Sequence, residues 1–193
     1  IKGNDELYAV GGVRGTDDGI PIKGSDEWPL VDKETGYVDI YEYERGQYNL
    51  DADMSEAWKV SVLKNHRFPE YEGEKYAPEA IVLNAIARAG YKIRWYAKII
   101  CTCEYQSDGI TKNDMLIQKN NPLGFSMAWK HKLKLKLPFK QKVYCLCQAE
   151  ALAMYGGRLG EVWKDNEHKL LSVLVLPIAY CVYLRRRSQF KRF

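Results

Sequence analysis

The sequence predicts an α/β fold in which a mixed sheet of few strands is followed by C-terminal helices. Strand-like runs that are apolar or alternate in polarity lie at 6–15, 37–43, 54–60 and 91–105. A bounded helical segment, 78–90, precedes the last of these runs, and two more helices are expected at 121–137 and 138–155. Hydrophobic content of 46% and charged content of 28% over 193 residues are globular values, so we expect a buried core.

The first strand is the run ELYAVGGVRG at 6–15. Gly11 and Gly12 inside it indicate a bulge or a close approach of another group to the backbone. Asp-Asp-Gly at 17–19 predicts a turn, and 20–24 a short return strand. Because the chain opens directly on this strand, we expect a piece of a longer protein. We also expect the strand to lack sheet neighbours, with an exposed edge through which copies could associate.

The segment GEKYAPEAIVLNAIARAGYKIRWY, from residue 73, predicts a helix that is followed by a strand. Pro78 suits the first helical turn, where its missing N–H would have no partner. Glu79 would then lie at the positive end of the helix dipole, which stabilises a carboxylate. Gly90 can adopt the left-handed conformation that ends a helix. The sequence thus predicts an oriented carboxylate beside a strand.

The second half of the chain reads as mostly helical. A polar stretch at 106–121 predicts a long connection, and connections of that length are often functional. Asn121-Pro122 and Pro138 predict the starts of the two helices at 121–137 and 138–155, and a polar helical segment is expected at 161–169.

The C-terminal region carries a strong positive charge. From Lys130 to the end there are 14 Lys/Arg and 4 Asp/Glu, whereas the preceding residues hold 15 and 21. The apolar run at 170–184 is too short to span a membrane, is expected to be interrupted by Pro177, and is followed by Arg-rich sequence. This pattern favours a helix on the surface of an anionic membrane, and the other interpretation is a buried helix pair with a disordered basic end.

Cysteine usage points to a reducing compartment. The five cysteines form an odd number, and two C-x-C pairs at 101–103 and 145–147 lack the usual zinc spacing. We therefore expect buried free thiols in a cytoplasmic protein.

Several stretches, in order along the chain, resemble the C-terminal half of bacterial family 2 glycosyltransferases of the capsule- and surface-polysaccharide type. The resemblance rests on VGGVRG from residue 10, LDADMSEAWKV from 50, FPEYEGEKYAPEAIVLNAIARAGYKIRWY from 68, IICTCEYQSDGITKN from 99 and NNPLGF from 120. It extends to the apolar and Arg-rich end. It implies a partial GT-A fold: residues 1–120 as the acceptor-side part of the catalytic domain, 121–169 as a helical extension and 170–193 as a membrane-associating tail.

The resemblance implies transfer of a sugar from a nucleotide-sugar donor to an acceptor hydroxyl. In inverting enzymes of this fold, a carboxylate at a helix start acts as general base. Counting back from Ala-Gly-Tyr at 89–91, Glu79 falls on the second acid of the family's E-D pair, and Pro78 replaces the first. Glu79 is therefore the expected catalytic base.

Three further site residues are implied by the resemblance. Asp53 falls on the acceptor side, and Asp108 falls near a His that touches metal or diphosphate in relatives. Asp108 could also begin an Asp-Gly turn. Lys112 could neutralise a diphosphate, or be an ordinary solvated lysine.

The family's N-terminal half, with the D-x-D that carries Mg²⁺ or Mn²⁺, has no counterpart in this sequence. We expect a divalent metal in the full-length enzyme, and no transfer by this chain alone. The alternative is a non-catalytic module that docks on anionic membrane through its basic tail. Either would lie on the cytoplasmic face of the membrane, and neither is expected to bind nucleic acid.

Overall fold

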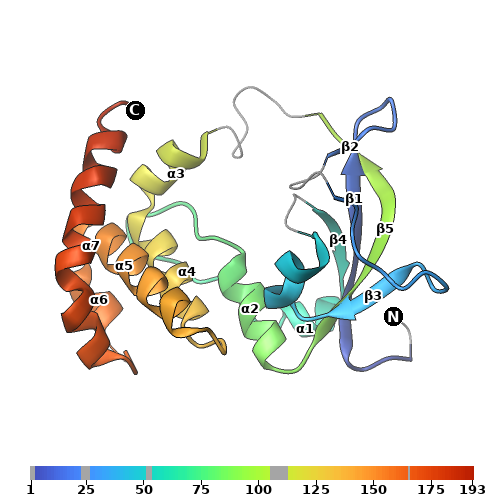
Figure 1. Cartoon of the computed structure of the whole chain (residues 1–193), viewed down its shortest axis with the longest axis horizontal. Coiled ribbons are helices and arrows are strands. Elements are labelled where there is room, and N and C mark those ends of the chain that lie inside the picture. Colours follow the sequence, from blue (N-terminus) through green and yellow to red (C-terminus); the bar gives the residue numbers. More distant parts are fainter. Residues whose placement is uncertain (1–2, 23–26, 51–53, 105–112, 165) are drawn as a thin grey trace. The chain divides into compact units, whose positions relative to one another are not determined.

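The computed structural model describes residues 3–22, 27–50, 54–104, 113–164 and 166–193 (Figure 1). Packing divides the chain into two compact units. Unit 1 comprises Ile1–Arg67 and Leu83–Gln106, and unit 2 comprises Phe68–Val82 and Ser107–Phe193. The three segments expected from the sequence, 1–120, 121–169 and 170–193, are a functional division and stay a prediction.

Unit 1 contains a five-stranded mixed sheet, which confirms the predicted fold class at the level of a mixed α/β protein. Strand β1 (Leu7–Gly15) is paired on both sides. The parallel strand β5 (Lys92–Thr102) lies along one side, and the antiparallel strands β4 (Met54–Trp58) and β2 (Pro21–Ile22) lie along the other. Strand β3 (Tyr37–Ile40) pairs antiparallel with β5.

The expectation that the first strand lacks sheet neighbours is wrong. β1 is hydrogen-bonded along both edges, because the chain returns to it through β4 and β2 on one side and β5 on the other. Because both edges of β1 are paired, this strand gives no reason to expect association between copies.

The predicted close approach at Gly11 and Gly12 is confirmed. A Cβ atom on Gly11 would lie 2.3 Å from a ring carbon of Trp95, which is fully buried, and one on Gly12 would lie 2.9 Å from Ile100. The pairing of β1 with β5 also shifts register between Gly12 and Val13, as in a bulge. These glycines let two strands and a large ring share the core.

Short helices connect the strands. The 3₁₀ helix η1 (Glu42–Tyr48) follows β3, and α1 (Val60–Leu63) follows β4. Helix α2 (Ala80–Arg88) precedes β5. Gly90 lies two residues after its end, and its φ of 96° is the left-handed conformation predicted there.

Unit 2 is helical and packs around α5 (Phe139–Tyr155), which contacts α4 (Pro122–Lys132), α6 (Leu159–Trp163) and α7 (Lys169–Phe190) (Figure 1). Nine consecutive residues of α5, 145–153, are buried, so the other helices enclose its second half. The helix start predicted at Pro138 is confirmed, because α5 begins at the next residue.

Two expectations for this region are wrong. The polar stretch at 106–121 is not a connection throughout, since it contains a helix, α3 (Asp114–Asn120). Gln118 on α3 accepts a hydrogen bond from Arg186 of α7 at 2.7 Å, a contact that helps to hold the helix in place. Pro177 does not interrupt α7, which continues for 22 residues. Pro177 lacks an N–H, but Val175 and Ala179 on either side of it are buried against α5, and this packing offsets the lost hydrogen bond.

The cysteine prediction is confirmed in part. Cys145 and Cys147 are buried free thiols, and burial raises the pKa of both. Cys101 and Cys181 are instead exposed, Cys101 on β5 and Cys181 on α7. Among the helices of the described residues, none is long and apolar enough to cross a membrane.

Candidate functional site

The candidate site is built on the loop 68–79 of unit 2, which leads into α2. This loop is held by the N-terminus of α4. The Glu74 carboxylate accepts the backbone N–H of Leu123 at 2.6 Å and that of Gly124 at 2.7 Å. The first N–H groups of a helix have no intrahelical partner and carry its positive dipole end, so a carboxylate is a favourable cap.

The adjoining Asn121 binds the loop in return. It is buried, and its Oδ1 accepts the backbone N–H groups of Lys75 and Tyr76 at 2.8 and 3.0 Å. Its Nδ2 donates to the carbonyl of Ile117 in α3 at 2.9 Å. A single amide thus ties the loop to the junction between α3 and α4.

Gly124 lets the loop approach α4 closely. A Cβ atom on Gly124 would lie 2.6 Å from the carbonyl oxygen of Tyr76 and 3.2 Å from the Cα of Ala77. The Tyr76 ring also stacks on Phe125, with ring centroids 5.6 Å apart. The sequence stretches FPEYEGEKYAPEA and NNPLGF are therefore in direct contact, although about 50 residues separate them in the chain.

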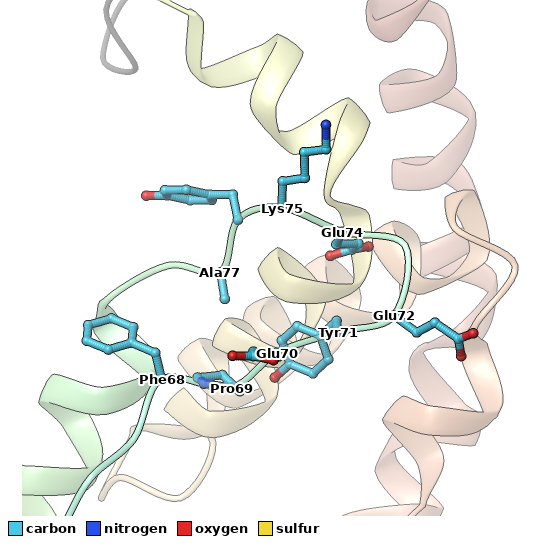
Figure 2. Close-up of a pocket in the computed structure, with 9 residues that line it drawn as sticks. Phe68, Pro69, Glu70, Tyr71, Glu72, Glu74, Lys75 and Ala77 are labelled. Atoms are coloured by element: carbon cyan, nitrogen blue, oxygen red, sulfur yellow. The ribbon is translucent and has the colours of Figure 1, made fainter. Parts of the chain in front are cut away.

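The anchored loop encloses a pocket of about 580 Å³, lined by residues 68–77 with the exception of Gly73 (Figure 2). This volume lies within the range of small-molecule pockets, about 300–1,000 Å³. The lining combines the aromatic rings of Phe68, Tyr71 and Tyr76 with carboxylates such as Glu70. Aromatic faces pack on the C–H faces of sugar rings, and carboxylates accept hydrogen bonds from sugar hydroxyls.

Tyr71 is the most perturbed group of the pocket. Burial raises its pKa to about 12, and the negative charges of Glu74 and Glu161 add to this effect. The phenol therefore stays protonated across the physiological range and can donate a hydrogen bond.

Glu79 follows the pocket-lining segment, two residues beyond Ala77. Its carbonyl accepts the N–H of Val82 at 2.9 Å, and α2 begins at Ala80. Glu79 therefore lies immediately before the first helical residue, whereas the sequence predicted that it would lie inside the first helical turn. Its side chain is exposed, so the carboxylate can meet a ligand from solvent.

The other predicted site residues, Asp53, Asp108 and Lys112, lie outside the described residues. The structure therefore places Glu79 alone of the four. Within the described ranges, no group of three or more His, Cys, Asp or Glu side chains could hold a metal ion.

Sequence reasoning missed the roles of Glu74, Asn121 and Tyr71. All three lie in stretches singled out by the family resemblance, but their functions depend on partners distant in the chain. The one indication in the sequence was Asn-Pro at the predicted start of α4. The first N–H groups of a helix lack intrahelical partners, so a side chain from elsewhere in the chain can accept their hydrogen bonds.

Comparison of the chain with family models, curated proteins and solved structures gave no significant match.

Proposed function

We propose that this chain carries the acceptor side of a glycosyltransferase that moves a sugar from a nucleotide-sugar donor to a hydroxyl of a saccharide acceptor. One observation carries the proposal. The stretches 68–80 and 120–125, which resemble family 2 glycosyltransferases, interlock through Glu74 and Asn121 around a pocket of aromatic and carboxylate side chains. A partial GT-A fold, and a surface or capsular polysaccharide as the product, belong to the same proposal.

In this proposal Glu79 is the general base. Its carboxylate takes the proton of the acceptor hydroxyl while that oxygen forms a bond to the anomeric carbon of the donor. The bond between the anomeric carbon and the nucleotide diphosphate breaks, and the diphosphate leaves with the electron pair. Exposure of Glu79 at the helix start supports this role, because the acceptor hydroxyl must be able to reach the base.

The aromatic residues of the pocket would bind the acceptor. Phe68 is 48% exposed, so its ring is available to a sugar face, whereas Tyr71 offers a hydroxyl that stays protonated. Asp53 and Asp108 on the acceptor side, and Lys112 toward the diphosphate, complete the proposed site. A divalent metal, Mg²⁺ or Mn²⁺, would neutralise the leaving diphosphate, and no metal-ligand group occurs in the described residues. The metal belongs to the proposed full-length enzyme because the family resemblance implies it.

The binding half of the proposal can be tested on this chain. A panel of bacterial oligosaccharides is titrated into labelled protein, and the shifts of backbone amides are followed by NMR. We expect at least one saccharide to shift amides of 68–79, and Phe68→Ala to weaken its binding. The matched control is Phe139→Ala, which removes a Phe that is 68% exposed at the start of α5, outside the pocket.

Binding that Phe68→Ala and Phe139→Ala weaken equally would contradict the pocket assignment. Absence of any saccharide binding would favour the alternative, a non-catalytic module.

A further inference from the structure

Helix α7 has two apolar faces, and only one of them has a partner in unit 2. The inward face buries Val175 and Ala179 against Cys145 and Leu146 of α5. Near its C-terminal end, Phe190 is buried. This face accounts for the packing of α7.

The outward face is also apolar, and it is exposed. We call it the α7 face and define it by five residues: Leu170, Val173, Leu174, Ile178 and Leu184. Counted from Leu170, the other four follow at three, four, eight and fourteen residues, and these offsets place all five on one side of a helix. They remain between 44% and 75% exposed. Leu170 and Leu184 are 14 residues apart, so the face is roughly 21 Å long at the helical rise of about 1.5 Å per residue.

Cations lie at both ends of the α7 face. Arg185, Arg187, Lys191 and Arg192 are exposed at its C-terminal end, and Lys169 is exposed at its N-terminal end. The sequence from residue 169 to 193 contains six Lys/Arg and no Asp/Glu.

Lys134 adds a further cation at the N-terminal end of α7. It is exposed, and it lines a small surface pocket together with residues 166–168, which lead into the helix and include one exposed carboxylate, that of Glu167. The positive charge at this end therefore comes from two segments that are distant in the chain.

Arg186 is the exception in the basic cluster. It points inward and donates hydrogen bonds to Gln118 of α3 and Gln148 of α5. This contact fixes the rotation of α7 about its axis, and so keeps the apolar stripe and the neighbouring arginines on the outer side.

We propose that the α7 face docks on an anionic lipid surface, with the helix axis in the plane of the membrane. The apolar side chains would enter the boundary between headgroups and acyl chains, and the cations at both ends would contact lipid phosphates. Charge complementarity selects this occupant. If a second copy of the chain covered the α7 face instead, the cations at the ends of the two faces would lie against one another and repel. The proposal is independent of the proposed catalytic function.

The test is co-sedimentation of the whole chain with vesicles of phosphatidylcholine alone and of phosphatidylcholine with about 30% of the anionic lipid phosphatidylglycerol. We expect binding to the anionic vesicles, weaker binding to the neutral ones, and a decrease as salt rises. Analytical ultracentrifugation without lipid should show a monomer.

Two variants separate the charged and apolar parts of the α7 face. The first, R185Q/R187Q/K191Q/R192Q, removes the exposed cations at the C-terminal end. Each cation near an anionic surface contributes about fivefold to binding, so this variant, which removes four, should bind roughly 600-fold more weakly. The second, L174E/I178E, should abolish binding to both kinds of vesicle.

Each variant has a matched control in unit 1. K33Q/K64Q/R67Q/R88Q removes four exposed cations, and I20E/L30E places two acids on exposed apolar positions. Both controls should bind like the unchanged chain. Circular dichroism checks that every variant is folded.

Three results would overturn the proposal. One is failure of the folded, unchanged chain to bind anionic vesicles. The second is an equal loss of binding in the variants and their controls. The third is a stable dimer in solution that L174E/I178E dissociates, because a second copy would then cover the α7 face.

Discussion

Replacing Glu74 by alanine removes the cap of α4 and should destabilise unit 2. Two backbone N–H groups, those of Leu123 and Gly124, lose charge-assisted hydrogen bonds of 2.6 and 2.7 Å. Hydrogen bonds to charged groups contribute about 1.5–3 kcal/mol each, whereas loss of a whole helix cap costs up to about 2 kcal/mol. Because the site is part-buried and water can reach the freed N–H groups, we expect a loss of about 2–3 kcal/mol in unfolding free energy.

Urea denaturation of Glu74→Ala measures the total loss, and amide hydrogen exchange at Leu123 and Gly124 locates it at the start of α4. Glu74→Gln keeps one carbonyl acceptor and should lose about half as much. The matched control is Glu72→Ala. Glu72 is exposed, and its side chain points away from the loop (Figure 2), so this change should stay within about 0.5 kcal/mol. A Glu74→Ala protein as stable as this control, with unchanged exchange at both amides, would refute the capping argument.

Two more predictions concern the cores of the units. Glu150 is fully buried and accepts a hydrogen bond from Trp163, and burial raises its pKa from 4.5 to about 6. The folded state therefore binds this proton more tightly, so stability should fall by about 2 kcal/mol as pH rises from 4.5 to above 6. Urea midpoints measured at pH 4.5 and pH 7.5 should differ in the unchanged chain and differ much less in Glu150→Gln. The same pH dependence in both proteins would show that Glu150 does not cause the fall. In unit 1, Gly11→Ala would place a Cβ 2.3 Å from the buried Trp95 ring and should cost about 3 kcal/mol in thermal unfolding. A cost under about 0.5 kcal/mol would show that the ring moves freely.

Features fixed by local chemistry could be predicted from the sequence. Pro138 marks the start of α5, and Gly90 ends the segment of α2 in a left-handed conformation, because each residue restricts or permits its own φ. Gly11 within an apolar strand indicated the close approach of another group, but not that the group is Trp95.

Features fixed by distant partners could not be predicted. The cap of α4 comes from Glu74, which lies 49 residues before Leu123. Helix α3 is short and polar, and its own residues do not indicate the contact with Arg186, which lies 68 residues after Gln118. The continuation of α7 through Pro177 likewise depends on burial against α5.

The candidate site divides in the same way. The position of Glu79 at a helix start could be predicted from Pro78 and Gly90, whereas its role as a catalytic base stays a prediction. The pocket around Tyr71 could not, because its shape depends on how the loop 68–79 bends over the N-terminus of α4.

The central claim is most directly tested by sugar transfer with Glu79→Gln. Transfer from a panel of nucleotide sugars to saccharide acceptors is measured with Mg²⁺ or Mn²⁺, in this chain joined to a donor-binding half. We predict that Glu79→Gln lowers kcat by about 10²–10⁴-fold, the usual contribution of a general base. Glu34→Gln, which changes an exposed carboxylate of unit 1 outside the pocket, should remain near the unchanged rate. Transfer by Glu79→Gln at a rate close to that of Glu34→Gln would contradict the assignment of Glu79 as the base.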